Sequence, residues 1–232
     1  MQRLVVFCDE SIEKGKYYSN FFGAIMVKEA DLVRVNNILE TKLKSLNLGK
    51  EVKFTRITTS YQTKYQELMV EFFRLVKSGE LKVRIMFTQN LDLPQLTPEQ
   101  RKRNKYFVLY YQLIKHAFGW QYMPDPTPYL LQLNFDVFPH TKGDIAEFKR
   151  YLVGLSNQPE LSSKGLIIYE RNIAEVDSSK HAILQCLDIV MGSMQFRLNN
   201  GHKNKEPGSR FISKRAKAKY AVYKTIHSEI LK

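Results

Sequence analysis

Short apolar runs alternate along the chain with segments of helical spacing. Residues 4–8 form a continuous apolar run that predicts a buried strand ending at Asp9-Glu10, and residues 18–27 predict a second strand paired with it as a hairpin. Further strands are expected at 81–87, 131–137 and 165–169, and helices at 32–46, 65–76, 97–117, 145–152, 178–198 and 212–230. This alternation favours an α/β layer fold over a helical bundle or a β-sandwich.

The composition is that of a globular protein. The chain has 232 residues, of which 44% are apolar and 25% are charged, which excludes collagen-like, disordered and low-complexity proteins. The sequence has no internal repeat, so we expect a single domain over residues 1–232 with a basic terminal helix at about 210–232. Cys8 and Cys186 lie in apolar runs and are expected to be reduced core residues. With no signal peptide and no apolar span of bilayer length, we expect a cytoplasmic protein that does not associate with membranes.

The charge balance indicates a polyanionic partner. Lys and Arg number 36 against 23 Asp and Glu, and the formal net charge is +13. Nucleic acid is favoured over a membrane surface, although a basic surface without a specific partner has the same composition. Two basic clusters are the expected phosphate contacts, unless they are simply solvated helix faces. Their members are Arg101, Lys102, Arg103, Arg210, Lys214, Arg215 and Lys217.

Acidic residues inside apolar segments run against this basic trend. The predicted helix at 178–198 is apolar over most of its circumference, which is typical of a buried helix. Its polar residues fall on one stripe: His181, Gln185, Asp188 and Gln195. A buried carboxylate such as that of Asp188 is costly unless it is paired or bound to a metal. The stripe is therefore a site of chemistry, a place where Asp188 pairs with Lys or Arg, or the solvent edge of the helix.

Three more acids occupy comparable positions. Asp9 ends a buried strand, where ligands collect in open α/β sheets, Asp136 lies on the polar face of its predicted strand, and Glu51 precedes a short apolar segment. Each has a structural alternative, respectively a turn cap, a half-exposed strand and a surface charge. Carboxylates that gather repel one another unless they surround cations, and Mg²⁺ or Mn²⁺ prefer oxygen ligands. Two such ions roughly 3.5–4 Å apart activate water and stabilise the leaving oxygen in phosphodiester cleavage.

The order of these motifs resembles that of a known family. The motifs are Asp9-Glu10-Ser11, Glu51-Val52-Lys53-Phe54, Asp136 on a strand, and Gln185-Cys186-Leu187-Asp188 on a late helix. In this order they resemble the bacterial and phage family catalogued as domain of unknown function 3800, whose members are similar to the ribonuclease H-like fold. The chain departs from the family pattern at Ile12, where glycine is usual, and at Leu187, where a small residue is usual.

The resemblance implies a ribonuclease H-like mixed sheet flanked by helices and a metal-dependent nuclease that uses two Mg²⁺ or Mn²⁺ ions. It implies that the catalytic metal ligands are Asp9, Glu51, Asp136 and Asp188. It also implies roles in positioning substrate or ligands for Glu10, Ser11, Lys53 and Gln185. His181 joins these from its place one turn before Gln185, as a proton shuttle or as a hydrogen-bonding residue at the helix start.

Other functions use the same residues differently. The main alternative is a non-catalytic module that binds nucleic acid or a protein partner, in which Lys53 or other basic residues neutralise the acids. A further alternative is phosphoryl chemistry on a small nucleotide. Metal-dependent hydrolysis of phosphodiester bonds in DNA or RNA is the expected function, since it accounts for both the basic surroundings and the acidic centre.

Overall fold

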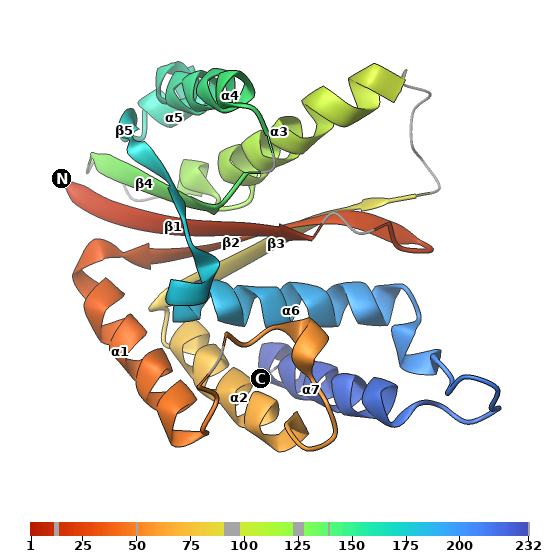
Figure 1. The fold of residues 1–232 in the computed structure, drawn as a ribbon. Coiled ribbons are helices and arrows are strands. Elements are labelled where there is room, and N and C mark those ends of the chain that lie inside the picture. The colour runs from red at the N-terminus through yellow and green to blue at the C-terminus, as the bar shows by residue number, and fades with distance from the viewer. Residues whose placement is uncertain (12–13, 50, 91–97, 123–127, 139, 232) are drawn as a thin grey trace.

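A mixed five-stranded sheet lies at the centre of the computed structural model, which describes residues 1–11, 14–49, 51–90, 98–122, 128–138 and 140–231 (Figure 1). At residues 98–105 and 121 the description is limited to the backbone. The sheet has the order β3-β2-β1-β4-β5. β1 pairs antiparallel with β2 and parallel with β4, β2 pairs antiparallel with β3, and β4 pairs parallel with β5. The strands are β1 (Gln2–Ser11), β2 (Tyr18–Lys28), β3 (Leu81–Gln89), β4 (Tyr129–Asp136) and β5 (Leu166–Val176).

Helices cover both faces of the sheet (Figure 1). One face carries α1 (Glu29–Ser45), α2 (Gln62–Lys77), α6 (Ala182–Leu198) and α7 (Lys214–Leu231). The other face carries α3 (Pro98–His116), α4 (Lys142–Gly154) and α5 (Pro159–Ser162). The described helices include none that is both long and apolar enough to cross a membrane. The predicted α/β fold class, a mixed sheet flanked by helices, is confirmed by this strand order and layering.

The alternation of side chains along β1 divides the core into two parts. Val5 and Phe7 pack with α1, α2, α6 and α7, whereas Val6 and Cys8 pack with α3 and α4 on the other face. Because successive residues of a strand point to opposite faces, Asp9 belongs to the α6 face. The expectation for the cysteines is confirmed, since Cys8 and Cys186 are both free and buried.

α6 approaches its neighbours closely at two glycines. Gly23 of β2 pairs with Asp9, and a Cβ there would lie 2.5 Å from Sδ of Met191 on α6. A Cβ on Gly192 of α6 would lie 2.5 Å from Cβ of Phe54, the first residue of the 3₁₀ turn η1 (Phe54–Arg56). The absence of these two side chains lets α6 lie tightly between the sheet and η1.

Several predicted boundaries along the strands are wrong. β1 does not end at Asp9-Glu10 but continues to Ser11, since its pairing with β2 extends to Phe21. β5 extends beyond residue 169 to Val176, because it stays paired with β4 although its second half is rich in polar residues. Residues 51–53 have no regular secondary structure, and the apolar Phe54 begins η1 rather than ending a short strand.

Two helix boundaries also differ from the prediction. The helix expected at 178–198 is divided into the 3₁₀ turn η4 (Ser178–Lys180) and α6, because the backbone of His181 is extended, with φ −121° and ψ 102°. The terminal helix begins at Lys214, so Arg210 lies in the preceding loop and cannot share a helix face with Lys214. Apolar periodicity does not reveal such breaks, since a 3₁₀ turn and a helix space their first residues similarly.

The close approach at Gly192 generates a stability prediction. Gly192→Ala forces η1 away from α6 and is expected to destabilise the protein by about 1–3 kcal/mol, measured by urea unfolding. Gly154→Ala is the matched control, since Gly154 has a helical backbone with φ −58° and a Cβ there meets nothing within 4 Å. The control should be neutral or stabilising by about 0.5–1 kcal/mol. Equal stability of the Gly192→Ala variant and the parent would contradict the close packing described here.

Candidate functional site

Three of the predicted carboxylates come to the same face of the sheet. The parallel pairing of Cys8 with Phe135 places Asp9 of β1 and Asp136 at the end of β4 at the same level of neighbouring strands. Asp188 comes from α6, which packs on β1 and β2. The glycine opposite Asp9, Gly23, allows this approach. Residues far apart in the sequence are therefore brought together by strand pairing and by the packing of one helix.

Asp9 is the carboxylate that both other aspartates affect. Burial raises the pKa of Asp9 well above its usual value, and the negative charges of Glu10, Asp188 and Asp136 raise it further. A hydrogen bond of 2.8 Å from the backbone N–H of Glu10 to Oδ1 opposes this rise. Burial and the neighbouring negative charges thus both oppose ionisation of the Asp9 carboxyl, and a nearby cation would act in the opposite direction.

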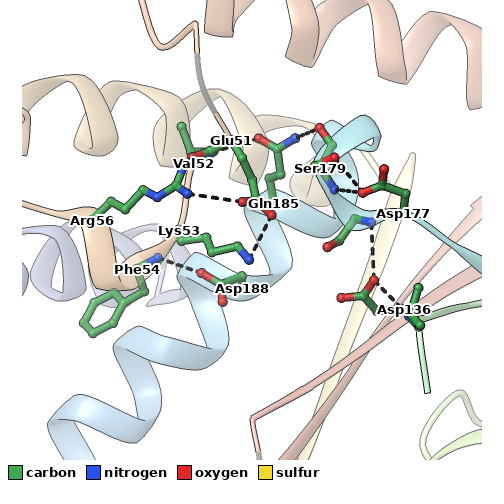
Figure 2. Close-up of polar contacts among 12 residues, drawn as sticks. Glu51, Val52, Lys53, Phe54, Arg56, Asp136, Asp177, Ser179, Gln185 and Asp188 are labelled. Carbon is green, nitrogen blue, oxygen red and sulfur yellow. Dashed lines mark hydrogen bonds and ion pairs between the residues drawn. The ribbon is translucent and has the colours of Figure 1, made fainter. Parts of the chain in front are cut away.

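Asp188 connects α6 to η1. Its Oδ2 accepts a hydrogen bond of 2.6 Å from the backbone N–H of Phe54 (Figure 2). Burial raises the pKa of Asp188, whereas the Phe54 N–H and the positive charges of Lys53 and Lys219 lower it. The stripe on α6 is thus not a solvent edge, since the polar atoms of Asp188 face a neighbouring backbone.

Asp136 connects the end of β4 to η4. Its Oδ1 accepts hydrogen bonds from the backbone N–H groups of Val137, at 3.0 Å, and Ser178, at 3.3 Å (Figure 2). In Asp9, Asp136 and Asp188, one carboxylate oxygen is thus held by the backbone. Among the described residues, the other oxygen of each carboxylate forms no hydrogen bond or ion pair.

Glu51 is engaged by cations. Its carboxylate forms ion pairs with Nζ of Lys53 at 3.0 Å and with Nη2 of Arg56 at 3.5 Å (Figure 2). Its negative charge also raises the pKa of Asp188, so the two acids lie within electrostatic reach of each other. This pairing is the one that the alternative of a non-catalytic module requires at this position. Metal ligation by Glu51 stays a prediction.

The donor atoms fit a hard divalent cation, although they do not surround one point. Within the described ranges, no group of three or more His, Cys, Asp and Glu side chains is placed to hold a metal ion. The three aspartates supply only oxygen ligands, and in this part of the chain none of them forms an ion pair with Lys or Arg. To hold one ion together, these carboxylates would therefore have to come closer to a common point.

Glu10 points to the opposite face of the sheet, as the alternation predicts. Its carboxylate accepts hydrogen bonds from the hydroxyls of Tyr106, at 2.8 Å, and Tyr110, both on α3. Burial raises the pKa of Glu10, and the two hydroxyls lower it. These tyrosines were not recognised from the sequence as partners of Glu10. The available signal was their spacing of four residues on one helix face, since a buried tyrosine hydroxyl needs a hydrogen-bond partner.

Gln185 holds the segment before η1 in place. Its Oε1 accepts a hydrogen bond of 3.0 Å from the backbone N–H of Val52, and its Nε2 donates one of 2.8 Å to the carbonyl oxygen of Ser179 (Figure 2). The side chain is buried, so these bonds fix residues 51–54 against η4. On the same helix Gln195 accepts a hydrogen bond of 2.8 Å from the hydroxyl of Ser11.

His181 packs against an aromatic core residue. Its ring centroid lies 5.5 Å from that of Phe7, and burial lowers its pKa. Although it is the N-cap residue of α6, its side chain forms no capping hydrogen bond. The structure therefore gives no support to the hydrogen-bonding interpretation of His181 at the helix start.

The basic residues of the terminal segment lie partly beside this site. Arg215 donates a hydrogen bond to the carbonyl oxygen of Thr55 in η1. Nζ of Lys219 lies 4.5 Å from the ring centroid of Phe54, and its charge lowers the pKa of Asp188. The sequence marked Lys219 as one cation of the basic terminal segment and did not place it beside the acidic centre, because only its packing beside Phe54 distinguishes it from the other cations of α7. The side chains of Arg101, Lys102 and Arg103 lie outside the described residues.

Comparison with known proteins concerns the fold. No protein-family model matches the chain, and no curated protein matches it. A solved complex of PCNA and RNase HII from Archaeoglobus fulgidus is similar with a TM-score of 0.46 and 14% identity, over 92% of this chain and 82% of that one. Ribonuclease H2 from Pyrococcus horikoshii OT3 gives 0.48 and 12%, over 99% and 100%. A mutant of Bst-RNase HIII gives 0.40 and 13%, over 86% and 54%.

Similarity of this degree says nothing about activity. The fold class follows from the strand order of the sheet and the helices on its two faces, without reference to these proteins. The resemblance to the family of unknown function stays a prediction that rests on the order of the acidic motifs.

The raised pKa of Asp9 predicts the pH dependence of stability without metal. Its folded-state pKa lies above the unfolded value, so stability falls as pH rises from the unfolded pKa, about 3.9, through the folded one. Asp9→Asn removes this loss and is expected to raise the melting temperature at pH 7.5 in EDTA, by about 2–4 °C per kcal/mol. The difference should disappear near pH 4. A lower melting temperature of the variant at pH 7.5 would mean that the ionised carboxylate stabilises the fold.

Proposed function

We propose that this protein is a metal-dependent nuclease that hydrolyses phosphodiester bonds of nucleic acid by a two-metal-ion mechanism. The observation that supports the proposal is the gathering of Asp9, Asp136 and Asp188 on one face of the sheet, where the other two charges raise the pKa of Asp9. Acids that gather on one face of the sheet in a chain with a net charge of +13 favour cation binding there. Its basic residues supply attraction for a polyanion.

Asp9, Asp136 and Asp188 would hold Mg²⁺ or Mn²⁺, with Glu51 as a fourth ligand. Two such ions, when bound, supply activation of water and stabilisation of the leaving oxygen. For Glu51 to join them, its carboxylate has to leave Lys53 and Arg56. The two cations released in this way would then face the substrate phosphate, so one rearrangement prepares both the metal site and the phosphate contact.

The remaining predicted residues would position these groups. Gln185 and Asp188 hold the segment that carries Glu51 and Lys53, through bonds to two backbone N–H groups. Glu10 and its two tyrosines fix the end of β1 from the opposite face. Because the residues on both sides of Asp9 are hydrogen-bonded or strand-paired, its carboxylate is presented from a rigid element.

Asp188→Asn tests the catalytic assignment. We expect Mg²⁺-dependent cleavage of labelled DNA and RNA oligonucleotides to fall by at least about 100-fold, since losing an outer partner of a metal site already costs about 10–100-fold. The fold should persist, because the amide oxygen can still accept the hydrogen bond from Phe54. Asp31→Asn is the control, since Asp31 lies on α1 in an exposed ion pair with Arg34. Cleavage by Asp188→Asn at the parent rate would refute the assignment.

The ion pairs of Glu51 support a second candidate function, a non-catalytic nucleic-acid-binding module. In that case the acidic centre is neutralised by the protein itself, as Lys53 and Arg56 already do at Glu51. The separation of the carboxylates from a common point fits this candidate too. The two functions differ in whether the folded protein binds divalent cations.

Thermal melting with Mn²⁺ separates the two candidates. A native metal site stabilises the protein by RT ln(1 + [L]/Kd), which is about 2.7 kcal/mol at 100 times Kd, or about 5–11 °C for a chain of this length. The parent should show this gain, and Asp9→Asn should lose it while remaining folded. An unchanged melting temperature of the parent in millimolar Mn²⁺ would favour the non-catalytic module.

A further inference from the structure

Four aromatic side chains form a continuous row along α7. The ring of His202, in the 3₁₀ turn η5 (Gly201–Lys203), stacks on Tyr220 with centroids 5.1 Å apart and planes inclined by 25°. Tyr220 stacks on Tyr223 at 5.8 Å and 10°, and Tyr223 contacts His227 at 5.7 Å and 33°. We call His202, Tyr220, Tyr223 and His227 the ring row. Steps of three and four residues keep its three helical members on one side of α7.

The ring row does not belong to the core. The side of α7 that packs inward is marked by the buried Ala218, Val222 and Ile226. At 100° per residue, the ring row is centred about 130° from these residues, on a stripe that begins at the buried Ala216. Further along this stripe Tyr220 and Tyr223 are half-buried and His227 is exposed. Neither tyrosine ring belongs to either core cluster. Core packing therefore does not explain why this row is aromatic.

The surroundings of the ring row are basic. Residues 201–232 contain nine Lys and Arg against Glu206 and Glu229. Both acids are engaged, since Glu206 accepts a hydrogen bond from the backbone N–H of Lys214 and Glu229 pairs with Lys77. Nζ of Lys224 lies 5.4 Å from the ring centroid of Tyr220. A row of partly exposed aromatic rings beside cations complements a ligand that carries both flat rings and negative charge.

We infer that the ring row is a base-stacking surface for single-stranded nucleic acid. Bases stack on aromatic side chains whatever their sequence, while Lys and Arg hold the phosphates. A duplex keeps its bases stacked inside and offers only phosphates to such a surface. The inference rests on the proposed function, because both assume that the protein binds nucleic acid. It adds that the bound substrate is single-stranded. The same helix carries Lys219 beside Phe54, so a strand bound along α7 leads toward the carboxylates.

Binding in EDTA tests the inference without cleavage. The full chain is titrated into fluorescein-labelled oligodeoxythymidine of about 20 nucleotides, and into a duplex of the same length, with fluorescence anisotropy as the readout. In the double variant Tyr220→Leu/Tyr223→Leu we expect the single-strand affinity to fall at least about fivefold and the duplex affinity to change less than about twofold. The slope of log affinity against log salt should stay at the parent value, because the phosphate contacts are unchanged.

Two further variants separate stacking from shape and from general surface effects. Tyr220→Phe/Tyr223→Phe keeps the rings and should bind within about twofold of the parent. Tyr151→Leu removes a tyrosine of α4 that is 59% exposed and should leave binding unchanged. If the double leucine variant melts well below the parent, Tyr223→Leu alone replaces it, with a smaller loss in the same direction.

Two results would overturn the inference. One is unchanged single-strand binding by a folded leucine variant, and the other is an equal loss for single strand and duplex. Failure of the proposed function appears elsewhere, as absence of stabilisation by Mn²⁺ and of cleavage. Since the binding assay contains no divalent cation, the two failures are distinguishable.

Discussion

The close packing of α6 against the sheet and η1 is the constraint on which the candidate site depends. Gly23 and Gly192 remove the side chains that would separate these elements. As a result, Asp188 can bond the Phe54 backbone while its charge reaches Asp9 on β1. If α6 were displaced outward by the thickness of a methyl group, the hydrogen bond from Phe54 to Asp188 and the electrostatic effect of Asp188 on Asp9 would both weaken. Close-packed protein interiors transmit such small changes in volume. The location of the acidic centre is thus a consequence of how tightly one helix packs.

The acidic centre carries negative charge in a protein whose net charge is positive. The chain carries a net charge of +13, yet Asp9, Asp136 and Asp188 gather without an ion pair among the described residues. The protein compensates at Glu51, where Lys53 and Arg56 neutralise the carboxylate. Backbone N–H groups supply the rest of the compensation, one carboxylate oxygen at a time. Such an arrangement holds the acids in a defined position and leaves an oxygen of each available to a cation.

The two faces of the sheet contribute differently to the candidate site. On the α3 face, the hydroxyls of Tyr106 and Tyr110 bind Glu10 and make the end of β1 rigid. On the α6 face, the neighbouring Asp9 is directed toward α6. α7 then extends the site outward, since Lys219 lies beside Phe54 and the ring row follows the outer side of the same helix. A single helix thereby connects the carboxylates with a surface suited to a nucleic-acid strand.

Local periodicity in the sequence was sufficient for the α/β class, for most strands and helices, and for the opposite orientation of Asp9 and Glu10, because alternation and helical spacing are properties of neighbouring residues. It also marked the acids of the centre, since acids within apolar segments stand out against a basic chain. Only the tertiary structure decided that Asp9 and Asp136 lie at one level, that Glu51 pairs with Lys53 and Arg56, and that the helix expected from Ser178 breaks at His181. These features depend on strand register and on contacts between distant segments, and neither leaves a signal in the local pattern of the chain.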